Sequence, residues 1–329
     1  MLDRLSLSMR ASHILVALLV IIALVFALVA WSTGDRFYLR LATEALIFAG
    51  LALSVDILLG YTGLLPLGQA LFFGFGAYVS ALVLREVPSF WVAIGVVFLS
   101  TLVVGLAGGL IASRARGVYF ALISFGLAQV VSKVVYNIRE LGASDGLRGI
   151  PILDIEFGLF SVSTNAPMAF FLFTLAFILI LYAIAAYLLD TPFGRVLIAL
   201  KANEKRVPFL GYSIFRARLA AFMLAAQIAA LSGALYPMLR GFVSPELMFF
   251  AVSGNAVIGV ILGGVGTLAG ALYGSILLTV MRSVVGTWTE HHLIVIGLVF
   301  MTVVIFLPRG LFGFVRPRLE ALLAREQRP

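Results

Sequence analysis

Residues with catalytic or metal-binding chemistry are few in this chain of 329 residues, and they do not cluster. The sequence has no cysteine, which excludes disulfide bonds, thiolate metal sites and cysteine nucleophiles. Glu290, His291 and His292 are consecutive, but consecutive residues do not share a helix face, and no second group of ligands lies nearby. We therefore expect no catalytic residue, no metal site and no bound cofactor.

Sequence motifs for nucleotide hydrolysis and for common hydrolases are also absent. No Gly-x-x-x-x-Gly-Lys-[Ser/Thr] motif occurs, and the nearest glycine-rich stretch, residues 263–270, has no lysine. Neither a Gly-x-Ser-x-Gly elbow nor a His-Glu-x-x-His motif is present. The chain is therefore not expected to be an enzyme. A channel, a secondary transporter or the membrane half of a pump stays open.

Polar side chains inside apolar segments are the remaining candidates for handling a solute. Gln129 and Ser132 are three residues apart and share a helix face, where they could line a path or join two helices by hydrogen bonds. Asn255 is the one strongly polar side chain of its segment. Asp56 lies near the end of an apolar run, and we expect it to reach water there rather than act as an intramembrane acid.

The elements that must position these residues are membrane helices. Hydrophobic residues make up 62% of the chain and charged residues 12%, with a mean hydropathy of +1.14, which no soluble domain of this size matches. The net charge of +8 does not indicate nucleic-acid binding, because the basic residues cluster between apolar runs. We expect an all-α, polytopic helical bundle with eight to ten membrane segments.

The apolar runs place about ten membrane-entering segments in a single transmembrane domain over residues 1–329. Residues 60–78 carry five glycines, a proline and no charge, which is typical of a broken helix buried in protein. Gly259, Gly263, Gly266, Gly270 and Gly274 form a second close-packing pattern. The predicted segments are 14–31, 43–59, a third that follows residues 60–78 and ends near 84, 91–112, 118–137, 167–189, 219–239, 245–262, 268–285 and 293–307.

Basic residues set the expected orientation. With both termini in the cytoplasm, Lys and Arg are about twice as frequent in cytoplasmic loops as in outer loops, as the positive-inside rule requires. The first apolar run is too long for a signal peptide and is expected to be a retained helix. Residues 308–329 then form a cytoplasmic tail.

Two loops are long enough to meet other proteins. In the cytoplasmic loop 190–215, Asp190 or Thr191 can cap a helix with Pro192 at its first position, and residues 195–206 have amphipathic spacing. That helix could lie in the headgroups or dock into a soluble partner. The outer loop 139–166 is acidic and rich in turn residues, so it is either a docking surface or a solvated loop.

Several motifs in order resemble one family, the permease subunits of branched-chain amino acid ABC importers, which include urea and amide importers. Residues 60–78 read Gly-Tyr-Thr-Gly-Leu-Leu-Pro-Leu-Gly-Gln-Ala-Leu-Phe-Phe-Gly-Phe-Gly-Ala-Tyr and resemble the signature stretch of the family, although Pro66 and Gln69 replace its usual serine and histidine. The length and the extra N-terminal helix resemble the longer of two paralogous permeases. Further family motifs lie at 116–121, 144–151, 191–195, 263–267 and 308–311.

The resemblance implies a type II ABC importer fold in the bacterial inner membrane. It also implies a heterodimer with the shorter permease, two cytoplasmic ATPases that hydrolyse ATP, and a periplasmic binding protein. Helix 195–206 would be the coupling helix, although Glu204 and Gly211 do not reproduce the Glu-Ala-Ala-x-x-x-Gly loop. Branched-chain amino acids are the expected solutes. Pro66 and Gln69 leave urea, short amides or aromatic acids open.

The importer interpretation has rivals from other classes of protein. A stand-alone channel or secondary transporter is the rival, and a genome neighbourhood without ATPase and binding-protein genes would favour it. A membrane enzyme or scaffold would need a reactive cluster, and none is visible in the sequence.

The same resemblance leads to the expected site residues. They are Gln69, Phe72, Gln129 and Asn255 for the translocation path; Arg195, Leu200, Lys201, Glu204 and Arg206 for coupling to the ATPase; and Asp145 and Arg148 for docking of the binding protein.

Overall fold

The computed structural model describes residues 2–32, 34, 36–151, 153–156, 161–288, 291–307 and 310–313. Glu290 and most of the predicted tail 308–329 lie outside these residues. The described chain is a bundle of helices, so the predicted all-α membrane architecture is confirmed. Its long helices are α1 (Leu2–Ser32), α2 (Arg36–Asp56), α3 (Ala70–Glu86), α4 (Phe90–Ala112), α5 (Val118–Asn137), α6 (Pro167–Asp190), α8 (Ile214–Gly233), α10 (Phe250–Gly263), α11 (Ala269–Trp288) and α12 (His292–Phe306).

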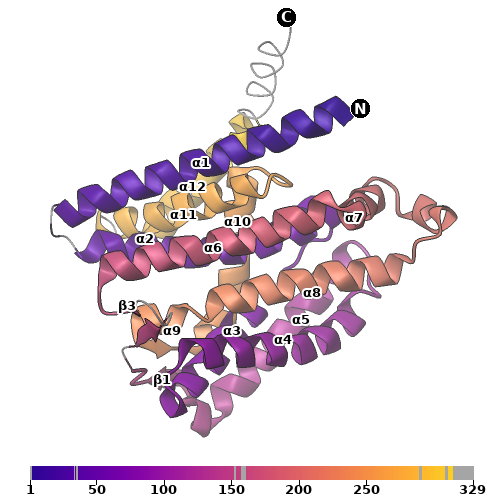
Figure 1. Ribbon diagram of the computed structural model, residues 1–329. Coiled ribbons are helices and arrows are strands. Elements are labelled where there is room, and N and C mark those ends of the chain that lie inside the picture. Colours follow the sequence, from indigo (N-terminus) through magenta and orange to yellow (C-terminus); the bar gives the residue numbers. More distant parts are fainter. Residues whose placement is uncertain are drawn as a thin grey trace, which may run out of the picture.

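Each predicted membrane segment overlaps one of these helices, although segment 219–239 extends past the end of α8 and segment 245–262 begins before α10. Within the described ranges, seven helices are long and apolar enough to cross a membrane, while α3, α10 and α12 are shorter. Most of the long helices run side by side, with α7 (Pro192–Ala202) at one end of the bundle and β1 (Leu147–Arg148) and α9 (Tyr236–Arg240) at the other (Figure 1).

Helix α2 lies at the centre of the bundle. It packs against α6, α8, α10 and α11, and 78% of the residues in its most apolar stretch are buried. A helix that is hydrophobic all round suits such a position. Helix α4 is the opposite case. Only 28% of the residues in its most apolar stretch are buried, and Leu99 and Val103 are largely exposed on it. Large exposed apolar side chains on a membrane helix suit a surface that faces lipid.

Glycines allow the inner helices to touch through their backbones. A Cβ at Gly76 of α3 would overlap the backbone of Ala230 on α8, and a Cβ at Gly233 of α8 would overlap the backbone of Phe73. Without a hydrophobic driving force in lipid, such close van der Waals packing holds helices together. The predicted glycine pattern of α10 and α11 is confirmed as well, since Gly263 and Gly270 meet in the same way.

The stretch 60–78 is broken, as predicted. Helix α2 continues as the π-helix η1 (Ile57–Thr62), and Gly63 then takes a φ of +74°, which favours glycine. Helical geometry resumes only at Ala70, whose backbone N–H donates to Ser253 Oγ of α10 over 2.9 Å. The expected exposure of Asp56 is wrong. Its side chain is fully buried, because its carboxylate lies against the backbone of Gly266 and Leu268 in the turn between α10 and α11.

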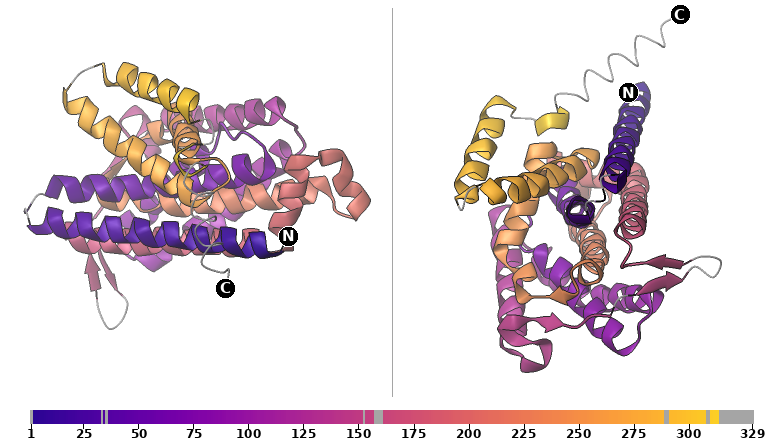
Figure 2. Two further views of the ribbon diagram at one scale, coloured as in Figure 1. Left: turned by 90° about the horizontal axis from the view of Figure 1, so that it is seen from above. Right: turned by 90° about the vertical axis from the view of Figure 1, so that its left-hand side faces the viewer.

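The loop 139–166 contains short strands that hydropathy does not predict. Strand β1 pairs antiparallel with β4 (Phe242–Val243), which follows α9, and β2 (Asp154–Glu156) pairs with β3 (Ser161–Ser163). The β2–β3 hairpin extends away from the helices in both views of Figure 2. Single-turn helices η2 (Arg139–Leu141), η3 (Ala143–Asp145) and η5 (Pro245–Met248) complete this end of the molecule.

The end of the predicted amphipathic helix needs a correction. Helix α7 begins at Pro192 after the N-cap Thr191, as predicted, but it ends at Ala202 and does not reach Arg206. Asn203 is extended, with a φ of −160°, and its side chain accepts a hydrogen bond from the backbone N–H of Lys205 over 3.1 Å. This local bond competes with the helix and starts the 3-10 helix η4 (Glu204–Leu210), so Glu204 and Arg206 lie outside α7.

Candidate functional site

A cavity of about 520 Å³ lies between α2, α9, α10 and α11, at the bundle end that holds β1 and β4. This volume is within the range of small-molecule sites, about 300–1,000 Å³. Four charged side chains of both signs line it, each from a different element. They are Glu44 of α2, Arg240 of α9, Glu246 of η5 and Arg282 of α11.

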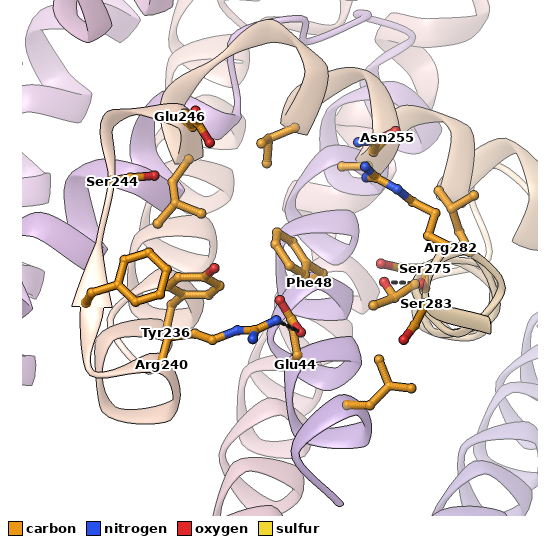
Figure 3. A pocket seen from close by; sticks show the side chains of 17 residues that line it. Glu44, Phe48, Tyr236, Arg240, Ser244, Glu246, Asn255, Ser275, Arg282 and Ser283 are labelled. Carbon is orange, nitrogen blue, oxygen red and sulfur yellow. Dashed lines mark hydrogen bonds and ion pairs between the residues drawn. The ribbon is translucent and has the colours of Figure 1, made fainter. Parts of the chain in front are cut away.

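Glu44 and Arg240 form an ion pair across the cavity (Figure 3). The Glu44 side chain is only 14% exposed, so the Arg240 charge offsets much of the cost of burying that carboxylate. Arg282 and Glu246 are more exposed, and Arg282 extends toward Asn255 in Figure 3. The cavity therefore presents both carboxylate and guanidinium groups to a bound solute.

Apolar and neutral polar groups form the rest of the cavity wall. Phe48 packs edge-to-face on Tyr236 with ring centroids 6.1 Å apart, and Leu247 and Val252 continue the apolar surface. Asn255 and the small hydroxyl residues of α11 supply hydrogen-bonding groups. The hydroxyl residues are Ser275, Thr279 and Ser283.

The four predicted path residues are not brought together by the fold. Asn255 lines the cavity. Gln69 and Phe72 are buried elsewhere, beside a void of about 10 Å³, where Phe72 packs edge-to-face on Phe222 at 5.4 Å. Gln129 is half-buried on α5, and its backbone carbonyl accepts the hydroxyl of Ser132 over 3.0 Å.

Sequence reasoning missed the charged residues of the cavity. Glu44 lies inside an apolar segment, and an ionisable residue there is a functional candidate by default. This signal was available from the sequence. Arg240 directly follows one predicted segment and Arg282 lies near the end of another, and only the fold shows that they face one cavity.

The predicted coupling residues divide into two groups on the loop at the other end. Three of them face the bundle. Leu200 is buried, and Lys201 Nζ donates to the carbonyl oxygen of Gly60 over 2.6 Å. Glu204 forms ion pairs with Arg218 at 2.6 Å and with Arg116 at 3.1 Å.

The other two, Arg195 and Arg206, are exposed. Arg195 also lines a groove of about 220 Å³ between α7 and η4. Phe209 and Leu210 stand beside this groove with 90% and 66% of their surface exposed. The face of the α7–η4 loop that points away from the bundle, called its outer face below, therefore combines positive charge with exposed apolar side chains.

Asp145 and Arg148 are exposed at the opposite end, as the docking prediction requires. Arg148 lies in β1 opposite Phe242 of β4, and Phe242 lines the cavity. The docking candidates are thus joined to the cavity rim by a strand ladder. In the part of the chain that the structure describes, no group of three or more metal-ligating side chains is found.

A bundle of long apolar helices with charged side chains around a cavity at one end is the architecture of a multi-pass membrane protein. Residues 37–304 match the family described as branched-chain amino acid transport system / permease component, and the chain belongs to this family. It is a permease subunit of an ABC importer, located in the inner membrane.

Curated relatives agree with this assignment. The chain is 30% identical to the high-affinity branched-chain amino acid transport system permease protein LivM of Escherichia coli, over 92% of this chain and 76% of LivM. It is 22% identical to LivH of E. coli, over 83% of this chain and 92% of LivH. The autoinducer 2 import system permease protein LsrC of Yersinia enterocolitica is 28% identical, over 88% and 81%. No solved structure matched the chain.

Similarity to both LivM and LivH points to a pair of paralogous permeases within the importer. The greater identity to LivM agrees with the resemblance to the longer paralogue.

Proposed function

We propose that this permease carries amino acids with apolar side chains, and that the cavity is its share of the translocation path. The observation that supports this most directly is that two carboxylates and two guanidinium groups, of which Glu44 and Arg240 form an ion pair, line a cavity with an apolar wall. An amino acid carries one ammonium and one carboxylate group beside its side chain. Each of these charges would then meet a partner of opposite sign.

Charge arrangement favours an amino acid over the alternative solutes. Charged side chains within membrane segments are costly, so they are kept where a charged solute or partner compensates them. Urea, short amides and other neutral solutes need hydrogen-bonding groups but no charge pair. Relatives named for branched-chain amino acid transport support the same choice. In this proposal Arg282 binds the solute carboxylate, Glu246 binds the ammonium group, and Phe48 and Val252 contact the side chain.

The proposed assembly has one permease domain, residues 1–329, beside a LivH-like paralogue and two ATPases. The ATPases dock on the outer face of the α7–η4 loop, where Arg195, Phe209 and Leu210 are exposed. In this proposal the coupling loop 190–215 lies in the cytoplasm, in accord with the positive-inside rule. Both termini and the tail 308–329 are assigned to the same side. A periplasmic binding protein docks at Asp145 and Arg148, and ATP-driven movement of α7 opens the path to one side at a time.

Uptake by the reconstituted complex tests this proposal. The permease is co-purified with its paralogue, the ATPases and the binding protein, and uptake of labelled leucine and urea into liposomes is followed with and without ATP. We expect ATP-dependent leucine uptake, and a rate at saturating loaded binding protein that falls by about tenfold or more in Arg282→Gln and Glu246→Gln, because a charge-assisted hydrogen bond contributes about 1.5–3 kcal/mol. Arg85→Gln, an exposed charge outside the cavity, is the matched control.

Each part of the proposal has its own contrary result. Uptake of urea without leucine would reject the amino-acid substrate. Unchanged leucine uptake in both cavity variants would reject the cavity as the path. Leucine uptake by the chain alone, without ATP, would replace the importer with a channel or secondary transporter.

A further inference from the structure

A series of contacts runs inward from α7 and reaches the walls of the cavity. It starts at Lys201, near the C-terminal end of α7, whose Nζ donates to the backbone carbonyl of Gly60 over 2.6 Å. Gly60 belongs to the π-helix η1, which is 141 residues away in sequence. A π-helix is a rare geometry that often marks a functional site.

The second contact joins η1 to the turn between α10 and α11. Asp56, the residue before η1, is fully buried. Its Oδ1 accepts the backbone N–H of Gly266 over 2.6 Å, and its Oδ2 accepts that of Leu268 over 2.9 Å. One carboxylate therefore holds both sides of the turn 264–268, and charge-assisted bonds of this type are the stronger class of hydrogen bond.

Direct backbone packing reinforces these two contacts. A Cβ added at Gly60 would lie 2.6 Å from Gly266 Cα, closer than real Cβ atoms come to the non-bonded atoms of other residues. Gly266 itself has a φ of +80°, a conformation that favours glycine. The π-helix is thus held between α7 on one side and the turn on the other, and at Gly60 and Gly266 the two backbones touch directly.

The turn leads directly to the cavity. Helix α10, which precedes it, carries Asn255, and helix α11, which follows it, carries Ser275 and Arg282, and all three residues line the cavity. A displacement of the turn would move both helices, because they pack tightly on each other through Gly259 and Gly263.

We propose that Lys201 and Asp56 are positioning residues that join α7, η1 and the turn 264–268 into one rigid unit. Through this unit, movement of α7 is transmitted to the α10 and α11 walls of the cavity. The inference rests on the proposed function in one respect, since it takes the ATPases as the source of that movement. Lys201 therefore acts toward the interior of the protein, although it lies on the coupling helix.

A distance measurement tests the rigid unit without any partner. Because the sequence has no cysteine, spin labels can be placed at two exposed sites alone, by Ile198→Cys on α7 and Val265→Cys in the turn. We expect a narrow distance distribution between the labels in the isolated permease, and a broader one after Lys201→Met. Lys205→Met, an exposed lysine of η4, is the matched control and should leave the distribution narrow. Equal widths in the Lys201→Met and control proteins would overturn the rigid unit.

A coupling measurement in the reconstituted complex tests transmission. ATP hydrolysed per leucine imported should rise several-fold in Lys201→Met and in Asp56→Asn, with recovery of the ATPases unchanged. The double variant should be no worse than the single ones, because both act in one series of contacts. Lys201→Arg, which keeps a donor for the Gly60 carbonyl, should restore most of the coupling.

Two outcomes would overturn transmission. One is an unchanged ratio of ATP to leucine in Lys201→Met, and the other is loss of the ATPases from the complex, which would make Lys201 a docking residue. Failure of the proposed function looks different, because the wild-type complex would then show no ATP-driven uptake at all.

Discussion

Glu204 binds two arginines of very different exposure, and this permits a sharp prediction on the α7–η4 loop. The Arg218 side chain is 4% exposed and also donates to the carbonyl oxygen of Ala115 over 3.3 Å, whereas the Arg116 side chain is 71% exposed. The perturbation is the same change at each position, Arg218→Gln or Arg116→Gln. The two variants differ in the burial of the broken ion pair and in the additional bond from Arg218 to Ala115.

The expected magnitudes follow from that burial. Breaking a buried ion pair costs about 3–5 kcal/mol, and the 25% exposure of Glu204 places Arg218→Gln near the lower value, at about 3 kcal/mol. An exposed pair contributes about 0–1 kcal/mol, so Arg116→Gln should be almost neutral. Within the described residues, Glu204 Oε1 has no aligned hydrogen bond despite its 3.1 Å contact with Arg116, which agrees with the weaker value.

Thermal unfolding of the purified permease in detergent measures the difference. Arg218→Gln should lower the melting temperature by on the order of 5 °C or more, while Arg116→Gln should leave it nearly unchanged. Adding Glu204→Gln to the Arg218 variant should cost little more, because the buried pair is already broken. Equal losses from the two arginine variants would refute the assignment of the loop anchor to Arg218.

Two further predictions concern packing inside the bundle. Gly76→Ala should destabilise the permease by about 1–3 kcal/mol, because its new methyl group overlaps the backbone of Ala230, whereas Gly95→Ala should cause no loss, since no described atom lies within 4 Å of that methyl group. Equal falls in the melting temperatures of the two variants would contradict this prediction. Gln69→Met should raise stability by about 1 kcal/mol, because the buried Nε2 of Gln69 has no hydrogen-bond partner among the described residues. If Gln69 also lines the path, the same variant should slow leucine uptake in liposomes, and a variant that changes neither property would contradict both roles.

The helices were predictable from the sequence because the bilayer imposes a simple rule. Every backbone polar group in lipid must be satisfied internally, so long apolar runs fold as helices, and each predicted run did so. The break near Gly63 was predictable for a related reason, since an apolar stretch rich in glycine and free of charge fits only a buried, irregular backbone.

The cavity and the loop contacts were not predictable in the same way. Glu44, Arg240 and Arg282 are far apart in sequence, and hydropathy does not say which helix ends meet. Hydropathy also places Asp56 near a boundary, but not under the turn that buries it. For Lys201 and Glu204, the amphipathic pattern marked a helix without showing which charges turn inward. Tertiary pairing decides these features, and one sequence contains no direct record of it.

The two-residue ladder between β1 and β4 has a thermodynamic consequence. It pairs Leu147 with Val243 and Arg148 with Phe242, so the exposed loop and the cavity rim share backbone hydrogen bonds. A protein that docks on the loop and favours one rim geometry must change the affinity of the cavity for its solute. By linkage, the solute then changes the affinity of the docked protein by the same factor. Delivery of the solute to the cavity and release of the docked protein would thus be governed by the same coupling free energy.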